Sequence, residues 1–521
     1  MVFFAIFLIV GVISVTYFIS MRISLAAFIV IASVLAIALV LSIIFMTAMG
    51  NKFVIKRLGK RLLLCAVAVV IGGASVSVTY GVQTRTYIEK DTYSITARVC
   101  EVPVANYDAN YLSLVLDDIM ITKGKDSYNL PKNLKVYFSG DNIRDNLEIG
   151  NVIKFSAKIY SVKMTDINEI GRDYYYLAND IYYSGSAKSE IEVLDEYRIN
   201  IFEKIRLKAK DILDSNLSED YSAIGYGMFF GEDAYISSEL SNTFTDAGIS
   251  HLLAVSGLHI GFVVLLLSSL FSLLHVNEKT SSIILIACLF FYVVLCEFTP
   301  SVVRAFIMTT CMLLSKLTKK PYDGLSALSL AAIIILLFSP LDLFTASFQL
   351  SFMAVLGILL LFPVFNKFFS KFLFEQFASS LSLSLAASIG IMPIMALSFE
   401  KFSALSVFTN MIVIPIASIA FMILFAAVII SMIVPSISII VVAFEFLMRF
   451  VTAVAAVAAS AWVNLYHVNV GSAFLFLVLG VSAIISEYVQ IKRPYKFLII
   501  MFILKCVALY YIVDFALILL L

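Results

Sequence analysis

The stretch His251-Leu-Leu-Ala-Val-Ser-Gly-Leu-His-Ile-Gly-Phe-Val-Val264 opens a long apolar segment near the middle of the chain. It carries two of the four histidines, together with a serine and two glycines. The hydrocarbon core of a bilayer offers such groups no water, so each must be buried against protein or line a wet cavity. We therefore expect an apolar helix here whose polar residues serve a function.

The composition of the whole chain extends this interpretation. Of its 521 residues, 61% are hydrophobic and 14% are charged, and the mean hydropathy is +0.98. A soluble globular protein is about 45–50% apolar and about 25% charged, so the composition predicts a polytopic α-helical membrane protein. The net charge of +1 points to no class of partner.

The apolar segments predict a topology. Lysine and arginine concentrate at 52–61, 316–320, 367–371 and 492–496, and all four loops fall on one side if every segment crosses the membrane. By the positive-inside rule that side, and the N-terminus with it, is cytoplasmic. Pro415 is expected to divide one segment, and Gly72-Gly73 predicts close helix packing in another. The thirteen predicted spans lie at about 2–20, 23–48, 62–81, 252–274, 282–298, 301–315, 324–338, 344–362, 378–398, 404–434, 437–467, 470–489 and 497–520.

Residues 83–198 differ in composition and predict a small extracytoplasmic β-domain. Short alternating stretches punctuated by Asn, Asp and Gly are typical of strands, and five or six of them favour an OB-like barrel. The domain contains 14 Lys/Arg and 18 Asp/Glu, a net charge of −4, which argues against a strong general grip on phosphates. The predicted strands are Ser94–Val102, Tyr111–Ile121, Leu134–Ser139, Val152–Val162, Asp180–Ser184 and Glu190–Leu194.

The segment 199–250 is predicted to hold interfacial helices. Residues 199–217 form an amphipathic pattern with Lys204, Arg206 and Lys208 on the polar face. A second helix is expected at Ser238–Asp246, with Gly248 as its C-terminal cap. The chain thus divides into N-terminal spans at 1–82, the β-domain at 83–198, these helices at 199–250, and a channel-like part at 251–521.

Ser256, His251 and His259 admit more than one interpretation. The histidines are eight residues apart, which is wider than metal ligands usually lie, and no third ligand is evident, so no metal site is predicted. Ser256 and His259, three residues apart on a helix, could form a catalytic pair in an intramembrane hydrolase. Packing or the lining of a pore is the favoured interpretation.

Arg304 is the second feature, because a charge one turn into a span must be paired or face water. Either it forms an ion pair with Glu297 that fixes two helices, or it is a fixed cation for a passing anion. Gln349 and Asn410 are weaker polar insertions that suit helix–helix hydrogen bonds or a pore lining. The structural candidates are Glu297, Pro300, Ser301 and Pro415.

Several kinds of chemistry have no motif in this sequence. There is no GxxxxGK[ST], so no ATPase motor is predicted. Four histidines without HExxH or HxHxDH predict no di-zinc nuclease, and no cofactor is expected.

The stretch that begins at His251 resembles the signature of the ComEC family, the inner-membrane channel proteins of bacterial natural transformation. Further matches follow in the family's order, at Gly225–Gly231, Pro300–Arg304, Phe348–Phe352 and Asn410–Pro415. The similarity covers about 225–435, and an OB-like domain ahead of the channel fits the family's layout.

The resemblance implies a channel in the bacterial cytoplasmic membrane that carries single-stranded DNA during transformation, with His251, Ser256, His259, Arg304, Gln349 and Asn410 along its path. It implies a separate cytoplasmic ATPase and an extracytoplasmic DNA receptor, and it leaves room for a separate nuclease, contacts with membrane lipid and homo-oligomers. Many members continue into a metallo-β-lactamase-like domain, and a form without that domain is expected here. A small-solute or anion transporter on the same scaffold is the alternative, and a hydrolase that uses Ser256 is more distant.

Overall fold

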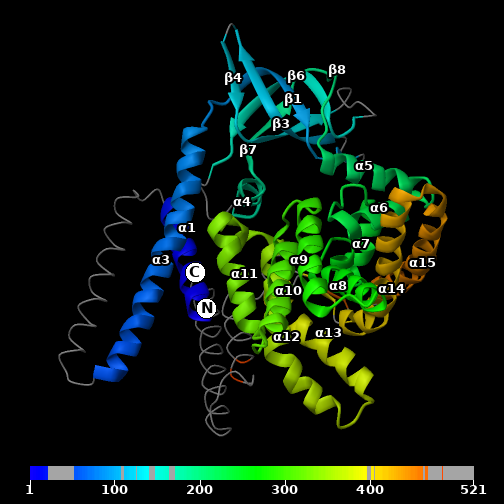
Figure 1. Ribbon diagram of the computed structural model, residues 1–521. Coiled ribbons are helices and arrows are strands. Elements are labelled where there is room, and N and C mark those ends of the chain that lie inside the picture. The colour runs from blue at the N-terminus through cyan, green and yellow to red at the C-terminus, as the bar shows by residue number, and fades with distance from the viewer. Residues whose placement is uncertain are drawn as a thin grey trace, which may run out of the picture. The chain divides into compact units, whose positions relative to one another are not determined.

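The computed structural model describes residues 1–20, 52–101, 103–106, 111–124, 126–139, 147–163, 170–395, 401–403, 405–460 and 464–466, with single residues at 481 and 484. The chain forms two compact units (Figure 1). The first comprises Met1–Ile205 with Ser329–Thr345, and the second comprises Arg206–Leu328 with Ala346–Leu521.

The first unit begins with a close pair of apolar helices, α1 (Val2–Ser20) and α3 (Lys52–Arg85). A β-carbon added to Gly72 would collide with the carbonyl oxygen of Leu8, and one added to Gly11 would collide with that of Val69. Small residues at such crossings let helix backbones approach, which membrane helices use in place of hydrophobic burial. The expected close packing at Gly72 is confirmed.

The β-domain of this unit is a closed five-stranded barrel. Strand β1 pairs with both β3 and β6, and the ring runs β1-β3-β5-β7-β6 with one parallel pair, β5 with β7. The short strands β2 and β4 each pair with β3, and β8 pairs with β6. The bounds are β1 Asp91–Val99, β2 Val104–Asn106, β3 Tyr111–Lys123, β4 Asp126–Leu130, β5 Asn133–Ser139, β6 Asn151–Ser161, β7 Ile181–Ala187 and β8 Glu192–Tyr197.

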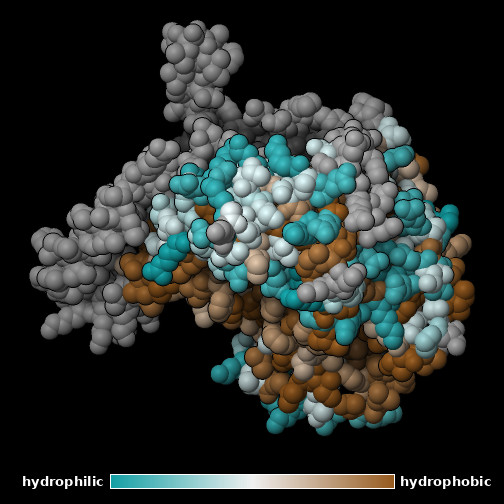
Figure 2. All heavy atoms as spheres, turned by 90° about the horizontal axis from the view of Figure 1, so that it is seen from above, coloured by the Kyte–Doolittle hydropathy of each residue, from teal (hydrophilic) through white to brown (hydrophobic). Residues whose placement is uncertain are grey.

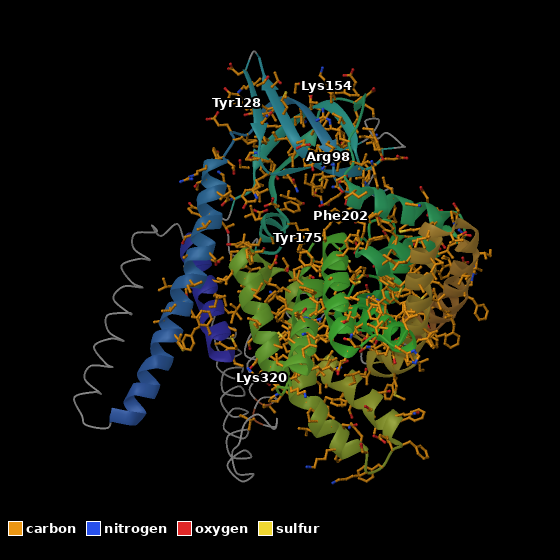
Figure 3. The ribbon with its side chains drawn as sticks, in the orientation of Figure 1. Arg98, Tyr128, Lys154, Tyr175, Phe202 and Lys320 are labelled. Atoms are coloured by element: carbon orange, nitrogen blue, oxygen red, sulfur yellow. The ribbon has the colours of Figure 1, made fainter. Side chains whose placement is uncertain are left out.

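This barrel confirms the predicted OB-like domain and all six predicted strands. Alternation is clearest in β5, where Leu134, Val136 and Phe138 are fully buried and the residues between them are not. Helix α4 (Ile170–Ala178) was not predicted, because its three consecutive tyrosines favour a strand by propensity. Arg98 of β1, labelled in Figure 3, forms ion pairs with Asp117 of β3 and Glu203.

The second unit is helical throughout its described length apart from one short strand pair. Helix α5 (Ile201–Asp214) begins with residues of the first unit and continues with residues of the second. Helix α11 (Gly324–Phe338) begins in the second unit, but its residues from Ser329 onward, and the 3-10 turn η4 (Pro340–Phe344), belong to the first. The other elements are α6 Glu219–Phe230, α7 Ser238–Asp246, η3 Ser250–Leu252, α8 Gly257–Leu273, α9 Glu278–Leu295, α10 Pro300–Thr318, α12 Ala346–Phe369, α13 Glu375–Ile394, β9 Lys401–Ser403, α14 Ser406–Ile433, η6 Pro435–Val441, α15 Val442–Ala459 and β10 Asn464–Tyr466.

These helices confirm a polytopic helical membrane protein. Within the described residues, seven helices are long and apolar enough to cross a membrane, and α1, α8 and α11 are shorter apolar helices. Figure 2 shows broad, continuous areas of hydrophobic surface, as lipid-facing helices present. The predicted spans at 23–48, 470–489 and 497–520 lie outside the described residues, apart from the single positions 481 and 484, so the total of thirteen stays a prediction.

The structure differs from two of the predicted segment boundaries. Pro415 does not divide its segment, because α14 continues through it from Ser406 to Ile433. A proline removes one backbone N–H from the helix. In hydrocarbon the remaining helical hydrogen bonds are favoured, because their groups would find no other partner. The long segment predicted at 437–467 does contain one candidate span, Ser438–Ala459, while Asn464–Tyr466 near its end form the strand β10, which pairs with β9.

The ends of two elements show how this unit is held together. Helix α7 has the predicted bounds, and Gly248 follows it in the left-handed region at φ 73°, as expected for a capping glycine. Glu445 of α15 accepts hydrogen bonds from the backbone N–H of Ser218 at 3.1 Å and from Arg449 Nε at 3.0 Å. Its carboxylate therefore satisfies the N-terminus of α6 as well as an arginine one turn away.

Candidate functional site: the Arg304 cluster

The signature stretch forms the turn η3 and the beginning of α8. Ser256 is the N-cap of α8, and its backbone N–H donates to Nδ1 of His259 at 3.0 Å. The first N–H groups of a helix have no partner within the helix, and a glutamate or glutamine three residues after the cap often supplies one. His259 holds that position here and acts as the acceptor.

This bond defines the chemistry of the Ser256–His259 pair. An imidazole nitrogen that accepts a backbone N–H has its lone pair occupied, so Nδ1 is not free to take a proton from a hydroxyl. Oγ of Ser256 lies 3.4 Å from the same atom, farther than the backbone nitrogen. The ring of His259 is 1% exposed and packs with its centroid 4.4 Å from that of Phe421 in α14. The geometry is that of a buried helix cap.

Arg304 lies one turn into α10, directly beside this helix start. Pro300 is the first residue of α10, where its missing N–H costs nothing, and Oγ of Ser301 donates to the carbonyl oxygen of Val255 at 3.2 Å. That bond attaches α10 to the signature stretch. A β-carbon added to Gly257 would lie 2.5 Å from Nη2 of Arg304, so only glycine leaves room for the guanidinium against the first residue of α8.

The guanidinium is buried between three helices. Arg304 is 5% exposed, and Nη1 donates to the backbone carbonyl of Ser351 in α12. Its carbon Cζ lies 5.9 Å from the ring centroid of Phe352, within the range of a cation–π contact. Figure 1 shows α8, α10 and α12 in the same part of the helical unit. We call Gly257, Arg304, Ser351 and Phe352 the Arg304 cluster.

The described residues supply no carboxylate to neutralise the charge of this cluster. Within the described parts of the chain no carboxylate forms an ion pair with Arg304. Nε of Arg304 and Oγ of Ser351 are buried and have no hydrogen-bond partner among the residues that the structure describes. The start of α8 adds the positive end of a helix dipole at the same place. A buried cation with spare donors beside a helix N-terminus is suited to an anion that accepts hydrogen bonds.

Glu297 corrects one of the two interpretations of Arg304. The carboxylate of Glu297 forms an ion pair with Arg206 of α5, not with Arg304. Sequence spacing favoured the nearer arginine, but Glu297 follows the end of α9 in the left-handed region at φ 52°, and its partner comes from another part of the chain. The interpretation of Arg304 as half of a structural ion pair with Glu297 is therefore wrong.

The remaining candidates lie around this cluster with varied exposure. His251 is exposed on η3, Gln349 is half-buried on α12, and Asn410 of α14 has a buried Oδ1 that lacks a hydrogen-bond partner. The structure thus brings Ser256, His259, Ser301 and Arg304 together through backbone contacts. No hydrogen bond within the described residues joins Oδ1 of Asn410 to them, and no group of three His, Cys, Asp or Glu there is placed to hold a metal ion.

Three members of the cluster, Gly257, Ser351 and Phe352, were not predicted as site residues. Ser351 contributes its backbone carbonyl, Phe352 its ring, and Gly257 the space left by an absent side chain. The signal available in the sequence was the glycine directly after an N-cap serine. Whether this glycine matters for a site depends on which side chain packs against it, and only the packing of the helices decides that.

The sequence around the Arg304 cluster is similar to that of a known protein family and of several curated proteins. A family described as "Competence protein" matches residues 228–491. ComE operon protein 3 of Bacillus subtilis is 34% identical over 206 residues, which cover 39% of this chain and 25% of that protein. An uncharacterized protein of Aquifex aeolicus is 33% identical over 217 residues, or 42% of this chain and 48% of that protein.

A third relative comes from Escherichia coli and is less similar. Uncharacterized protein YcaI of Escherichia coli is 25% identical over 207 residues, 38% of this chain and 28% of that protein. The match thus spans less than half of the length of each of these curated relatives. No solved structure matches the chain.

Proposed function

The chain belongs to the competence protein family, that of ComEC, and from this premise we propose that it acts in DNA uptake, as a channel that carries single-stranded DNA across the bacterial cytoplasmic membrane. The matched residues contain the Arg304 cluster and the whole of the signature stretch. In this proposal the N-terminus lies in the cytoplasm and the β-domain lies outside.

The observation that carries the proposal is the uncompensated charge of Arg304. A buried arginine without a carboxylate is costly in a membrane protein unless an anion or water approaches it. The phosphodiester groups of a DNA strand are anions with oxygen acceptors, and they match the free Nε–H of Arg304 and the hydroxyl of Ser351. The adjacent start of α8 favours the same ligand.

A strand also needs polar and aromatic surface along its path. His251, Ser256, His259, Gln349 and Asn410 are proposed to contribute polar atoms, and aromatic rings such as Phe352 beside Arg304 offer faces on which bases stack. We propose that a separate cytoplasmic ATPase pulls the strand, that an extracytoplasmic receptor delivers it, and that a separate protein supplies any nuclease. Lipid contacts and homo-oligomers fit the same proposal.

Deletion of the gene followed by a transformation assay tests this function directly. Transformation frequency is expected to fall to background in the deletion strain and to return when the intact gene is supplied on a plasmid. Labelled DNA should still bind to the cell surface but should not become resistant to added nuclease. An unchanged frequency in a strain shown to be transformable would refute the proposal.

A transporter of small anions is the second candidate, because Arg304 would serve it equally well. The two are separated by the same deletion strain. Loss of DNA uptake with normal uptake of phosphate, sulfate and small organic anions supports the DNA channel, and the reverse result supports the transporter.

Replacing Gly257 with alanine is expected to reduce DNA uptake about tenfold or more, although Arg304 is intact. The new methyl group would occupy a position 2.5 Å from Nη2 and would displace the guanidinium from the start of α8. Uptake of labelled DNA measures the effect. Gly261→Ala is the matched control, since a β-carbon there meets nothing within 4 Å, and equal losses in both variants would contradict the role of Gly257.

Replacing Ser256 with alanine distinguishes a channel from a hydrolase. Alanine keeps the backbone N–H that donates to His259, so we expect DNA uptake within about twofold of the unmodified protein. A hydrolase that used Ser256 as its nucleophile would lose all activity. Labelling of Ser256 by a fluorophosphonate probe would favour the hydrolase, whereas loss of DNA uptake without labelling would mean that the Ser256 hydroxyl is needed in the path itself.

A further inference from the structure

Arg206 is a buried arginine that the proposed function does not use. It was expected on the polar face of an interfacial helix with Lys204 and Lys208, which are indeed exposed, yet Arg206 is only 6% exposed. Its side chain forms ion pairs with Glu297 and, at 3.5 Å, with Glu232. Nε also lies 3.4 Å from the hydroxyl of Tyr226 in α6. One arginine thus connects α5 to Glu232, two residues after the end of α6, and to the turn between α9 and α10.

The turn that Arg206 contacts has an unfavourable backbone conformation. Glu297 and Phe298 have φ of 52° and 55°, and consecutive left-handed residues other than glycine are rare because the β-carbon crowds the backbone. Such a conformation persists only where surrounding contacts hold it. The ion pair with Arg206 is one of them. A second is the hydroxyl of Tyr292 in α9, which donates to the carbonyl of Phe229 at 2.7 Å.

This turn leads directly into the first turn of α10. Pro300 begins the helix, Ser301 binds the carbonyl of Val255, and Arg304 follows one turn later. The direction in which α10 leaves the turn therefore determines where the guanidinium of Arg304 lies relative to Gly257. A displacement of the guanidinium by about 1 Å is enough to impair a function that depends on its exact position.

We propose that Arg206 is a positioning residue: by holding Glu297 in its left-handed conformation, it aims α10 so that Arg304 meets the start of α8. Arg206 touches no residue of the Arg304 cluster in this arrangement and acts through the turn. The consequence for transport rests on the proposed function, whereas the effect on the turn does not.

Cys296 provides a native reporter for the turn. It directly precedes Glu297, is 1% exposed, and its Sγ lies 3.8 Å from the carbonyl oxygen of Phe229. In the full chain with the other five cysteines replaced by alanine, N-ethylmaleimide should react slowly with Cys296. Arg206→Met is expected to raise this rate about tenfold or more, because it removes a contact that holds Glu297 in its left-handed conformation, and the turn then opens. The other cysteines are Cys65, Cys100, Cys288, Cys311 and Cys506.

Three further variants separate positioning from general destabilisation. Arg206→Lys keeps the charge and should restore both protection of Cys296 and DNA uptake. Lys204→Met makes a similar change at an exposed position of the same helix and should alter neither. Glu297→Gln should raise the Cys296 rate as Arg206→Met does, and the double variant should be no worse than Arg206→Met alone, since both changes remove the same Arg206–Glu297 ion pair.

The outcomes are decisive for the positioning role. An unchanged Cys296 rate in Arg206→Met and Glu297→Gln, or additive effects in the double variant, would overturn it. If Arg206→Met does not fold, Glu297→Gln, which preserves shape, provides the same test. Because the thiol reaction requires no DNA, a wrong proposed function would leave the Cys296 result intact, and uptake alone would fail to follow it.

Discussion

Arg304→Met is expected to lower DNA uptake about 10- to 100-fold while leaving the protein at least as stable as before. A charged hydrogen bond to a phosphate contributes about 1.5–3 kcal/mol, which corresponds to that range. Methionine has a similar volume and cannot donate. The stability is expected to hold because the arginine is 5% exposed without a carboxylate, so its removal relieves a desolvation cost.

The measurements are uptake of labelled DNA by cells and the midpoint of thermal unfolding in detergent. Arg449→Met is the matched control, because that guanidinium is 61% exposed and paired with Glu445, and it should leave uptake within about twofold. Arg304→Lys keeps the charge but lacks the planar fork, so an intermediate loss is expected. A large drop in the unfolding midpoint of Arg304→Met, with uptake lost in proportion, would instead mean that Arg304 is structural.

Gly390→Ala is expected to destabilise the helical unit by about 1–3 kcal/mol, the usual cost of forcing extra volume into a packed interior. Gly390 of α13 faces Gly357 of α12. A β-carbon on Gly390 would collide with the carbonyl oxygen of Met353 and lie 3.0 Å from Cα of Gly357. Both contacts are to backbone, so the helices must separate rather than a side chain rotate. The buried cluster of Leu360, Leu361 and Ala386 beside them would loosen.

Thermal unfolding of the purified protein measures this effect. Gly261→Ala is the control, since it places the same methyl group on α8 with nothing within 4 Å, and helix propensity favours alanine by about 1 kcal/mol. We expect that variant to be neutral or slightly stabilised. Equal midpoints for Gly390→Ala and the unmodified protein would show that α12 and α13 are not packed through their glycines.

The β-domain was largely predictable because strands have a local signal. Alternation between buried and exposed positions repeats every two residues, and it located Leu134–Ser139 to within one residue of β5 (Asn133–Ser139). What alternation does not contain is the partner of each strand. The parallel pairing of β5 with β7 and the closure of β1 on β6 depend on contacts between residues far apart in sequence.

The same distinction applies to the helices. Apolar length predicted most spans, and the turn chemistry at Gly248 predicted the end of α7, because both are properties of a few neighbouring residues. Pro415 was misjudged for the converse reason. A proline weakens a helix locally, but whether the helix bends or breaks is decided by its surroundings, and α14 remains continuous.

The stretch from His251 to Val264 separates what the sequence determined from what the tertiary structure decided. By itself the sequence determined that an apolar helix begins there, which residue types it carries and which family it resembles, since all of these are written in order along the chain. Only the tertiary structure decided that His259 caps the helix and that Glu297 neutralises Arg206. It also decided that Arg304 lies against Gly257 with no carboxylate partner among the described residues. The physical reason is that charge compensation depends on distances in space, and folding alone brings those groups together or keeps them apart.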